Sequence, residues 1–514
     1  MFKKSAIAGA AIIALALVVT GCTGSGNSPS KESKTLTVGL ATGPVSLDPS
    51  KGAAGFGEFF TDPAYASLIN TSEKGDLIPG LAEKWGYVGD DNKTFTLTLR
   101  SGLKFADGTD LNAQSVVNSV AYFVTGSGPT TAYFRNLKLT ATDNLTVNVV
   151  SSEPNPLMPF LFSNTVLGGD IISAAGIDDP TGLASTTHGA GPYVYDAAQS
   201  VAEDHYVYTP NKNFWDQTAI HFDKIEIKVI PQIQSLVQAL KSGQIDTMVG
   251  DPSVESSIKG NASIAIEAAP IVWNGVYLLD RNGVVAPALA DLRVRQALNY
   301  AVDRSAIAKV AYGDSAVATD QAAVTGFDGY DPALEGTYPY DPEKAKQLLQ
   351  EAGYGNGFSM AVNYQSFDPG STKMIQAVAA QWAKIGVTLE LKGNTNFGEW
   401  VGDLVSKKFP ASVLNGTGGQ PQYLDAEFAW LPTAIMNVFQ VADPGVAEAF
   451  NTLATASPDN SGKAAQAFQK VIVDNAIAVP IVQYDATLYH GTNLKGVVFP
   501  PGFAAPSSIV TWTK

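Results

Sequence analysis

The reactive side chains of this chain are few and scattered. The 514 residues contain one cysteine, Cys22, and four histidines that form neither an i, i+4 pair nor a His-x-His motif. The histidines are His188, His205, His221 and His490. Because a protein zinc site needs several such ligands at close spacing, we expect no metal site. No motif in the sequence indicates a cofactor, so we expect none.

Motifs for nucleophilic and phosphate chemistry are also missing from the sequence. It has no Gly-x-Ser-x-Gly elbow, no P-loop and no dinucleotide-binding glycine pattern. Adjacent carboxylates such as Asp90-Asp91 and Asp178-Asp179 stand in polar, turn-like sequence, where a solvated surface explains them better than acid/base chemistry. We therefore predict that the chain is not an enzyme. A Ser/His/Asp triad assembled in space stays open, because triads are defined by geometry.

Cys22 directly follows an apolar segment near the N-terminus. Two lysines precede the apolar residues 5–19, and small residues lead from these to the cysteine, which is typical of a secretory signal peptide. The segment is too short for an ordinary transmembrane helix. The run Val19-Thr20-Gly21-Cys22 resembles the lipobox of bacterial lipoproteins, so we expect cleavage before Cys22 and acylation of its thiol. A plain signal peptide with a chance cysteine, or a signal anchor, is the alternative.

The predicted mature chain is acidic and has its own tether. Residues 1–21 form the lipoprotein signal peptide, and residues 22–34 hold the acylated cysteine and a flexible segment rich in glycine and serine. Removing the signal peptide takes away two lysines and moves the formal charge from −15 to −17. An acidic chain without a basic cluster argues against nucleic acid as a partner. With Cys22 acylated, no disulfide is possible.

Alternating and one-sided apolar patterns indicate strands and helices after residue 34. Residues 94–100 and 225–230 alternate polar and apolar side chains, as strands with one buried face do. A one-sided apolar stripe over residues 233–240 and a further strand over 245–249 then complete a β-α-β unit.

Helices and a further strand are also predicted in the second half of the chain. Helices are predicted to begin at Asp291 and Asp341, which are good N-cap residues, and another helix is predicted over residues 375–385. A strand follows over residues 387–391. The body is therefore predicted to be α/β throughout, and its length favours two or three lobes.

Eight stretches, in order and over almost the whole mature chain, resemble one protein family. They are residues 46–49, 77–85, 99–108, 189–193, 211–215, 238–246, 292–304 and 340–345. On these motifs the chain resembles extracellular solute-binding protein family 5, which comprises dipeptide-, oligopeptide- and nickel-type substrate-binding lipoproteins of ABC transporters. Most of the motifs are helix caps, strand ends and turns, so we interpret them as scaffold.

The resemblance implies a two-lobed α/β fold of the periplasmic-binding-protein type II (Venus flytrap) kind, with an extra subdomain on the first lobe. By analogy, lobe 1 is discontinuous and consists of residues 35–75, 188–280 and 486–514. The extra subdomain is residues 76–187, and lobe 2 is residues 281–485.

The resemblance also implies a function. Such a protein is the substrate-binding lipoprotein of an ABC importer, which closes two lobes on a peptide or another small solute and delivers it to a permease with ATPase subunits. It would be a monomer, held by its lipid on the extracytoplasmic face of the cell membrane, at the cell surface or in the periplasm. A secreted lipoprotein hydrolase and a surface signalling or adhesion receptor on the same fold are the alternatives.

The nature of the solute depends on one loop. Peptide-binding members of the family pair the α-amino group of the peptide with an aspartate in a loop of the second lobe. The corresponding loop here is residues 413–423, and alignment places Thr417 at the aspartate. Because a buried ammonium without a counter-ion is costly, we expect a neutral solute such as an oligosaccharide or blocked peptide, or else a metal chelate. Nearby Asp425 is a possible substitute for the aspartate.

The other candidate ligand contacts are aromatic and amide side chains on loops that the resemblance places at the cleft. They are Phe59, Phe60, Tyr65, Trp273, Asn274, Tyr364, Gln365, Trp400, Asn415, Gln420 and Tyr423. A place in the core explains each single aromatic residue at least as well. The polar, glycine-rich loop 415–423 has little value in a core and is the strongest candidate.

Overall fold

A computed structural model describes residues 34–52, 55–250, 254–313, 316–414 and 418–514, and only the backbone of residues 55 and 56. The first strand, β1 (Thr35–Leu40), begins where the sequence predicts the start of the folded body. In these described ranges, no helix is both long and apolar enough to cross a membrane.

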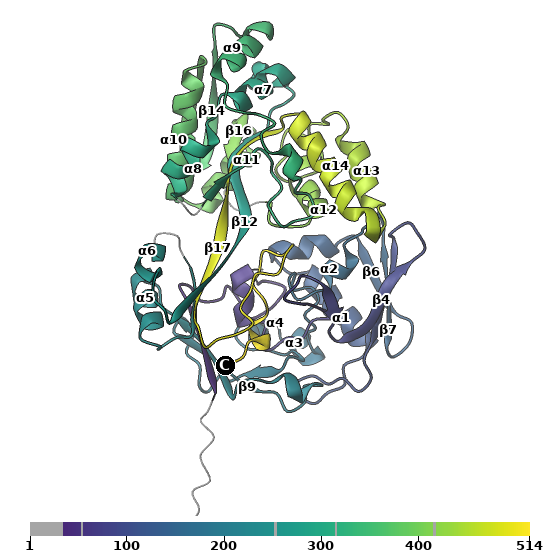
Figure 1. Cartoon of the computed structure of the whole chain (residues 1–514). Coiled ribbons are helices and arrows are strands. Elements are labelled where there is room, and N and C mark those ends of the chain that lie inside the picture. Colours follow the sequence, from purple (N-terminus) through teal and green to yellow (C-terminus); the bar gives the residue numbers. More distant parts are fainter. Residues whose placement is uncertain (1–33, 53–54, 251–253, 314–315, 415–417) are drawn as a thin grey trace, which may run out of the picture. The chain divides into compact units, whose positions relative to one another are not determined.

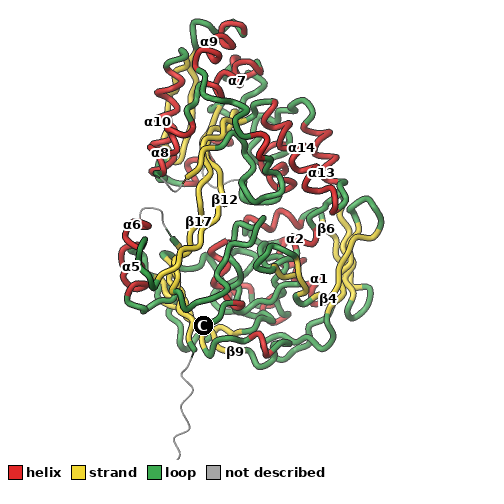
Figure 2. The backbone as a smooth tube through the Cα atoms, viewed as in Figure 1, coloured by secondary structure: helices red, strands yellow, loops and turns green. Residues whose placement is uncertain are grey.

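The described residues form a large mixed sheet of 11 strands, which Figure 2 shows in yellow. In order from one edge, the strands are β15 (Val387–Asn394), β14 (Phe358–Gln365), β16 (Ala411–Val413), β12 (Ile264–Leu278), β17 (Ala478–Gly491), β11 (Thr247–Val249), β1, β10 (Lys224–Val229), β9 (His205–Pro210) and β8 (Tyr193–Tyr195), and β13 (Ala316–Ala318) also pairs with β17. Two groups are internally parallel. We call them the β14 group (β15, β14 and β16) and the β1 group (β11, β1 and β10).

The long strands β12 and β17 join the two parallel groups and run side by side between them (Figure 1). Register shifts interrupt their pairing after Pro270 and before Gly275. Because proline cannot donate to a ladder, it is tolerated in a central strand at such irregularities. Pro270 stands at the first shift, and Pro480 pairs with Gly275 at the second. A Cβ at residue 275 would lie 2.3 Å from the carbonyl oxygen of Val479, so glycine is required there.

Helices flank each part of the sheet (Figure 1). Beside the β1 group are α5 (Ile233–Lys241) and α6 (Glu255–Ile258). The β14 group packs with α7 (Leu292–Tyr300), α8 (Arg304–Tyr312), α9 (Pro342–Glu351), α10 (Pro369–Ala383) and α11 (Phe397–Val405). The shorter α12 (Gln422–Asp425) packs with α13 (Val446–Ala454) and α14 (Ser461–Asp474). The α/β character predicted from the sequence is confirmed.

Residues 76–187 add a second, antiparallel sheet. Its order is β4 (Ala82–Val88), β5 (Thr94–Leu99), β7 (Thr146–Ser151) and β6 (Leu137–Ala141). Helix α1 (Ala113–Val124) packs on this sheet, and α2 (Met158–Leu161), α3 (Ala174–Asp178) and α4 (Pro180–Leu183) follow along the chain. The short pair β2 (Ile69–Thr71) and β3 (Leu77–Pro79) precedes it.

The local predictions from sequence hold in several elements. Strand β5 buries every second side chain, as its alternation predicts. The carboxylate of Asp291 accepts a hydrogen bond from the backbone nitrogen of Arg293 at 2.8 Å, and that of Asp341 accepts one from Lys344 at 2.9 Å. Both aspartates are therefore N-caps, of α7 and α9.

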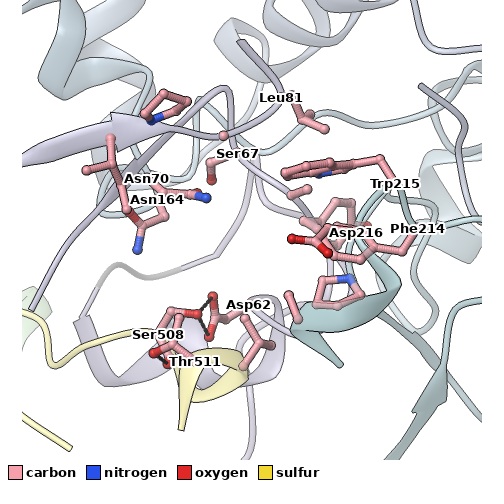
Figure 3. Close-up of a pocket in the computed structure, with 18 of the residues that line it drawn as sticks. Asp62, Ser67, Asn70, Leu81, Asn164, Phe214, Trp215, Asp216, Ser508 and Thr511 are labelled. Carbon is pink, nitrogen blue, oxygen red and sulfur yellow. Dashed lines mark hydrogen bonds between the residues drawn. The ribbon is translucent and has the colours of Figure 1, made fainter. Parts of the chain in front are cut away.

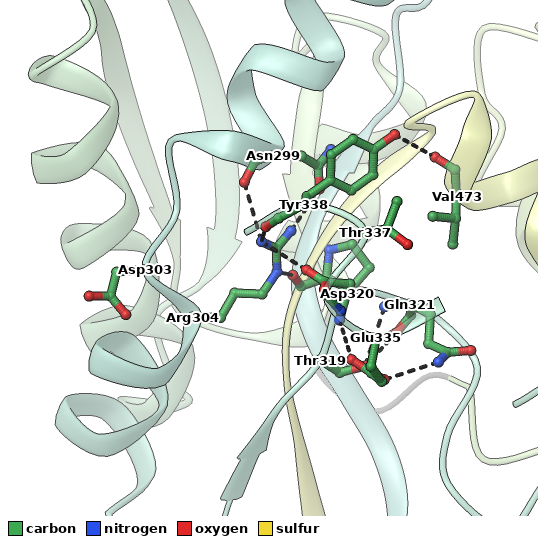
Figure 4. Close-up of polar contacts among 12 residues, drawn as sticks. Asn299, Asp303, Arg304, Thr319, Asp320, Gln321, Glu335, Thr337, Tyr338 and Val473 are labelled. Carbon is green, nitrogen blue, oxygen red and sulfur yellow. Dashed lines mark hydrogen bonds and ion pairs between the residues drawn. The ribbon is translucent and has the colours of Figure 1, made fainter. Parts of the chain in front are cut away.

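Arg304, the first residue of α8, joins several segments around strand β17 (Figure 4). Its Nε donates to the carbonyl oxygen of Pro480 at 2.8 Å, and its other nitrogens donate to the Oδ1 of Asn299 at 2.8 Å and the carbonyl oxygen of Tyr338 at 3.0 Å. Asp320 pairs with it at 3.0 Å, and both side chains are 7% exposed. Because a buried charge needs a partner and hydrogen bonds, this network fixes β17 near a register shift.

We predict that Arg304→Ala lowers the free energy of unfolding by about 3–5 kcal/mol, because it leaves the buried Asp320 carboxylate without its counter-ion. Arg293→Ala is the matched control, since it removes an exposed arginine that pairs with Asp291, and it should cost about 1 kcal/mol or less. Urea unfolding at neutral pH measures both variants. Equal losses would show that the buried pair has no special importance for stability.

Candidate ligand-binding site

The candidate site is built on the carboxyl ends of the two parallel groups. In open α/β sheets, ligands bind in the crevice outside these strand ends. Strands β1 and β11 end at Leu40 and Val249, and strands β14 and β16 end at Gln365 and Val413. The segments that follow these four residues are therefore where ligand contacts are expected.

A cavity of about 440 Å³ lies at the carboxyl ends of β1 and β11. Its lining includes the loop 41–46, Phe60, Leu167 and Gly250. The volume is within the range of roughly 300–1,000 Å³ that is usual for small-molecule sites. Val45 of the loop is 82% exposed, so the lining of the cavity includes a solvent-exposed apolar side chain.

The buried carboxylate of Asp48 holds the loop of this cavity in place. It accepts a hydrogen bond from the Oη of Tyr122 at 2.8 Å and from the backbone nitrogen of Ser50 at 2.9 Å. Lys51 pairs with it at 3.2 Å. Because these contacts satisfy the buried charge, the motif at residues 46–49 supports the loop.

On the side of the β14 group, Asn274 of β12 is the centre of a buried polar cluster. Its Nδ2 donates to the Oη of Tyr312 at 2.7 Å and to the Oγ of Ser371 at 2.8 Å. Ser371 in turn donates to Asp368 at 2.5 Å. The Oδ1 of Asn274 has no hydrogen-bond partner among the described residues. Since a buried oxygen without a partner costs about 1–3 kcal/mol, a bound solute that donates to it would be stabilised.

A buried aromatic stack lies next to the end of β16. The ring of Trp273 is 4.9 Å from that of Tyr277 and 6.5 Å from that of Trp430, between ring centroids. Gly418 covers the indole: it has a φ of +90°, and a Cβ there would lie 2.2 Å from the Cδ1 of Trp273. Only glycine fits this position, so the start of segment 418–425 is held tightly against the stack.

Asp425, at the end of that segment, is a buried carboxyl group. It is 2% exposed, and it accepts hydrogen bonds from the Nε1 of Trp430 at 2.6 Å and the Nε2 of Gln422 at 3.4 Å. Burial raises the pKa of Asp425 to about 7, although these hydrogen bonds oppose the shift. Burial also raises the pKa of Asp328 and that of Glu427. We call these three carboxyl groups the acidic cluster.

Two tyrosines connect segment 418–425 with the residues 76–187. The Oη of Tyr133 donates to the Oε1 of Gln420 at 3.3 Å, and the Oη of Tyr423 donates to the carbonyl oxygen of Pro154 at 3.0 Å. Burial raises the pKa of Tyr133 to about 12, and the nearby carboxyl groups of Glu427 and Asp425 add to this. The phenol therefore stays protonated and remains a donor at neutral pH.

The structure brings most of the sequence-predicted site residues to the strand ends. Phe60 lines the cavity beside β1, and Tyr364, Gln365, Asn274, Trp273, Gln420, Tyr423 and Asp425 lie at or beside the ends of β14 and β16. Tyr364 and Gln420 are half-buried, whereas the others are buried. Asn415 and Thr417 lie outside the described residues.

Three other predicted residues have contacts typical of a core. Phe59 packs edge-on against Trp512, and Tyr65 is 3% exposed and lines a different cavity. The Nε1 of Trp400 donates to the carbonyl oxygen of Val413 at 3.0 Å, so this side chain supports the end of β16.

Several residues of the site were not predicted from sequence. Tyr133 is 287 positions from its partner Gln420, and no local pattern indicates such a contact. Asp328 and Tyr312 stand in segments without a distinctive motif. Glu427 could have been found, because it lies two residues after Asp425 in an otherwise apolar stretch.

Across the part of the chain that the structure describes, no three His, Cys, Asp or Glu side chains are grouped so as to hold a metal ion.

Residues 76–432 match a family described as bacterial extracellular solute-binding proteins, family 5 Middle. Among curated proteins, the chain is similar to heme-binding protein A from Haemophilus influenzae, with 29% identity over 345 residues, or 61% of each chain. It is 30% identical over 354 residues to the dipeptide-binding protein of Escherichia coli K12, covering 63% of this chain and 64% of that protein. The chain thus matches less than two thirds of the length of these two relatives.

A longer alignment joins the chain to the probable D,D-dipeptide-binding periplasmic protein DdpA of Escherichia coli K12. Identity is 27% over 507 residues, which are 93% of this chain and 94% of that protein.

Solved structures show the same architecture. HbpA2 from Haemophilus parasuis superposes with a TM-score of 0.78 at 23% identity, over 92% of this chain and 98% of that chain. The ABC transporter substrate binding protein CtaP from Listeria monocytogenes gives 0.77 at 21% identity, over 94% and 99%. The predicted fold class is confirmed: two lobes of the periplasmic-binding-protein type II kind, with an extra subdomain.

We predict that Asp425→Asn stabilises the protein more at pH 8 than at pH 5. The pKa of Asp425 is about 7 in the folded protein and about 3.8 in a free side chain, so between these values the folded state keeps a proton that the unfolded chain has lost. The stability that this group contributes is present at low pH and falls as the pH rises towards 7. In the Asp425→Asn variant, the side-chain oxygen still accepts a hydrogen bond from Trp430, but the side chain does not titrate. The loss of stability with rising pH is therefore absent from the variant.

Urea unfolding of both proteins at the two pH values measures this effect, which should be on the order of 2–3 kcal/mol. Asp459→Asn, at an exposed position, is the control and should show no such change. An equal effect of Asp425→Asn at both pH values would contradict the raised pKa.

Proposed function

Because the chain belongs to family 5 of the bacterial extracellular solute-binding proteins, we propose that it is the substrate-binding component of an ABC importer. It captures a peptide or another small solute between two lobes and delivers it to a permease that works with ATPase subunits. The observation that carries this proposal is the sheet: two parallel groups, each with candidate contacts at its carboxyl ends, are joined through β12 and β17. Two bodies on such a connection can close on a solute and release it.

The division into lobes follows the path of the chain. We propose lobe 1 as residues 35–75, 188–280 and 486–514, the extra subdomain as residues 76–187, and lobe 2 as residues 281–485. The ends of β12 at Leu278 and of β17 at Gly491 lie within about ten residues of two of these boundaries, and the sheet β4-β5-β7-β6 lies wholly in the subdomain. A monomer is sufficient for this design, since both halves of the site come from one chain.

We propose that the bound solute carries no free ammonium group where the loop 413–423 contacts it. Thr417 offers a hydroxyl group, which can hydrogen-bond a neutral group but cannot neutralise a cation. Asp425 is buried and already accepts from Trp430, and its pKa of about 7 leaves the carboxyl group only partly ionised near pH 7. N-blocked peptides, oligosaccharides and metal chelates therefore suit the site better than free-amino peptides. Binding without chemical conversion is the activity that this arrangement supports.

We predict that an N-acetylated tripeptide binds at least tenfold more tightly than the same peptide with a free amino group, since the unpaired ammonium is costly in a closed site. Calorimetry of the mature chain against this pair, maltotriose and a nickel–histidine chelate measures affinity. The best ligand should lower the radius of gyration in small-angle X-ray scattering and raise the melting temperature. Thr417→Asp should reverse the preference within the peptide pair, whereas Thr417→Ser should keep it.

Two results would count against these proposals separately. Micromolar binding of free-amino peptides that is lost on acetylation, and lost in Asp425→Asn, would assign the ammonium to Asp425 and overturn the proposed ligand class alone. An unchanged radius of gyration at saturation, or conversion of the ligand to product, would contradict the binding function itself.

We also propose that the mature chain is a lipoprotein on the extracytoplasmic face of the cell membrane. The support is the run Val19-Thr20-Gly21-Cys22 after an apolar segment, all of which lies outside the described residues. A diacylated cysteine gives stable anchoring, whereas a single chain binds a membrane only reversibly.

Cys22→Ser should release the folded protein from the membrane fraction, because it removes the thiol that carries the lipid. Cell fractionation with a high-salt wash, followed by a melting curve of the released protein, measures this. Ser25→Ala, in the same tether, is the control and should leave the protein anchored. Membrane association of Cys22→Ser at the wild-type level would contradict the lipoprotein assignment.

A further inference from the structure

A second cavity, of about 240 Å³, shares no lining residue with the cavity beside β1 (Figure 3). Segments that are far apart in sequence line it, among them residues 62–71, 78–81, 214–221 and 508–511. Its volume is below the roughly 300–1,000 Å³ of sites for drug-sized ligands, so it suits a single small ring.

Three of the motifs interpreted as scaffold meet at this cavity. The motif at residues 77–85 contributes residues 78–81, the motif at 189–193 contributes Pro192, and the motif at 211–215 contributes Phe214 and Trp215. None of them reaches the cavity beside β1. The solute-binding function proposed above therefore does not explain why these motifs come together.

Trp215 gives the cavity an aromatic wall that is 41% exposed. The guanidinium carbon of Arg100 lies 4.1 Å from the centroid of the Trp215 ring, and Arg100 is not part of the lining. The cation thus covers one face of the indole. The faces of an aromatic ring carry partial negative charge. Since Arg100 already interacts with this charge from one side, the other face of Trp215 is better suited to neutral C–H groups than to a second cation.

Opposite the indole stand polar groups that have no partner among the described residues. Figure 3 shows Asn70 and Asn164 on one side of the cavity, and Phe214, Trp215 and Asp216 on the other. Within the described residues, the side chain of Asn70 and the Nδ2 of Asn164 make no hydrogen bond, since Asn164 uses only its Oδ1, which accepts from Thr71 at 3.1 Å. Asp216 uses one oxygen, which accepts from the Oγ1 of Thr218 at 2.6 Å. The cavity therefore keeps both donors and acceptors free.

The carboxylate of Asp62, at the base of the cavity, already accepts hydrogen bonds from the protein. Asp62 accepts hydrogen bonds from the Oγ of Ser508 at 2.7 Å and from the backbone nitrogen of Ile509 at 2.8 Å. Burial also raises the pKa of Asp62 to about 6, although these hydrogen bonds oppose the shift. This group is therefore a poor counter-ion for a cationic ligand, which again favours a neutral one.

We propose that this cavity is a second binding site, which takes one neutral hydroxylated ring such as a sugar unit. The C–H face of the ring packs on Trp215, and its hydroxyl groups hydrogen-bond to the amides of Asn70 and Asn164 and to the free oxygen of Asp216. The site is independent of the one at the strand ends. It binds its ring whether or not that site is filled.

NMR titration of the mature protein with methyl β-D-glucopyranoside, N-acetyl-D-glucosamine and tetramethylammonium tests this proposal. We expect at least one of the two sugars to bind with a Kd of about 1 mM or below, and tetramethylammonium not to bind. Trp215→Ala and Asn70→Ala should each weaken binding of the sugar about tenfold. Tyr340→Ala, which removes a 43% exposed aromatic side chain elsewhere, is the matched control and should leave it unchanged.

Asn70→Ala is expected to leave the fold intact, because the side chain that it removes makes no hydrogen bond to the described residues. Melting curves of all variants check that they fold. The proposal is overturned if neither sugar binds, if Trp215→Ala and Asn70→Ala bind the sugar as the wild type does, or if tetramethylammonium binds and Trp215→Ala abolishes that binding.

Discussion

The antiparallel pairing of β12 with β17 is the interaction on which the rest of the structure depends. Among the described strands, this pairing is what places the β14 group and the β1 group in one sheet, so the carboxyl ends of both groups belong to one continuous framework. Hydrogen bonds between two neighbouring strands resist sliding along their length. The pairing therefore keeps the two sets of candidate contacts in register, although the ends of β1 and β14, at Leu40 and Gln365, are more than 300 residues apart in sequence.

Near the strand ends of the β14 group lie buried polar atoms without a partner in the part of the chain that the structure describes. The Oδ1 of Asn274 and the Nε1 of Trp273 have no partner among the described residues, and Asp425 is a buried carboxyl group with a raised pKa. A core built for stability alone would avoid such groups, because each costs free energy. Their concentration at one edge of a sheet is typical of a site whose partners arrive with the ligand.

Sequence alone predicted the local elements well and the long-range contacts poorly. The caps at Asp291 and Asp341 depend on neighbouring residues, so their patterns are visible in a short window. The insertion of β1 between β10 and β11 joins residues about 190 apart, which no local pattern encodes. In the site, Trp273 and Asp425 were predicted through family resemblance, whereas Tyr133 was not. Aromatic residues in a core, such as Phe59, look the same in sequence as those that meet a ligand.

The two register shifts in the β12–β17 pair also set how the connection deforms. Each shift breaks the ladder and increases local twist, so bending concentrates at Pro270 and Gly275 rather than along the whole length. Trp273 lies between these two compliant points and packs against Trp430 of the neighbouring segment. Bending at either point would therefore change the orientation of the Trp273 indole relative to that of Trp430, and the tryptophan fluorescence of the protein would report it.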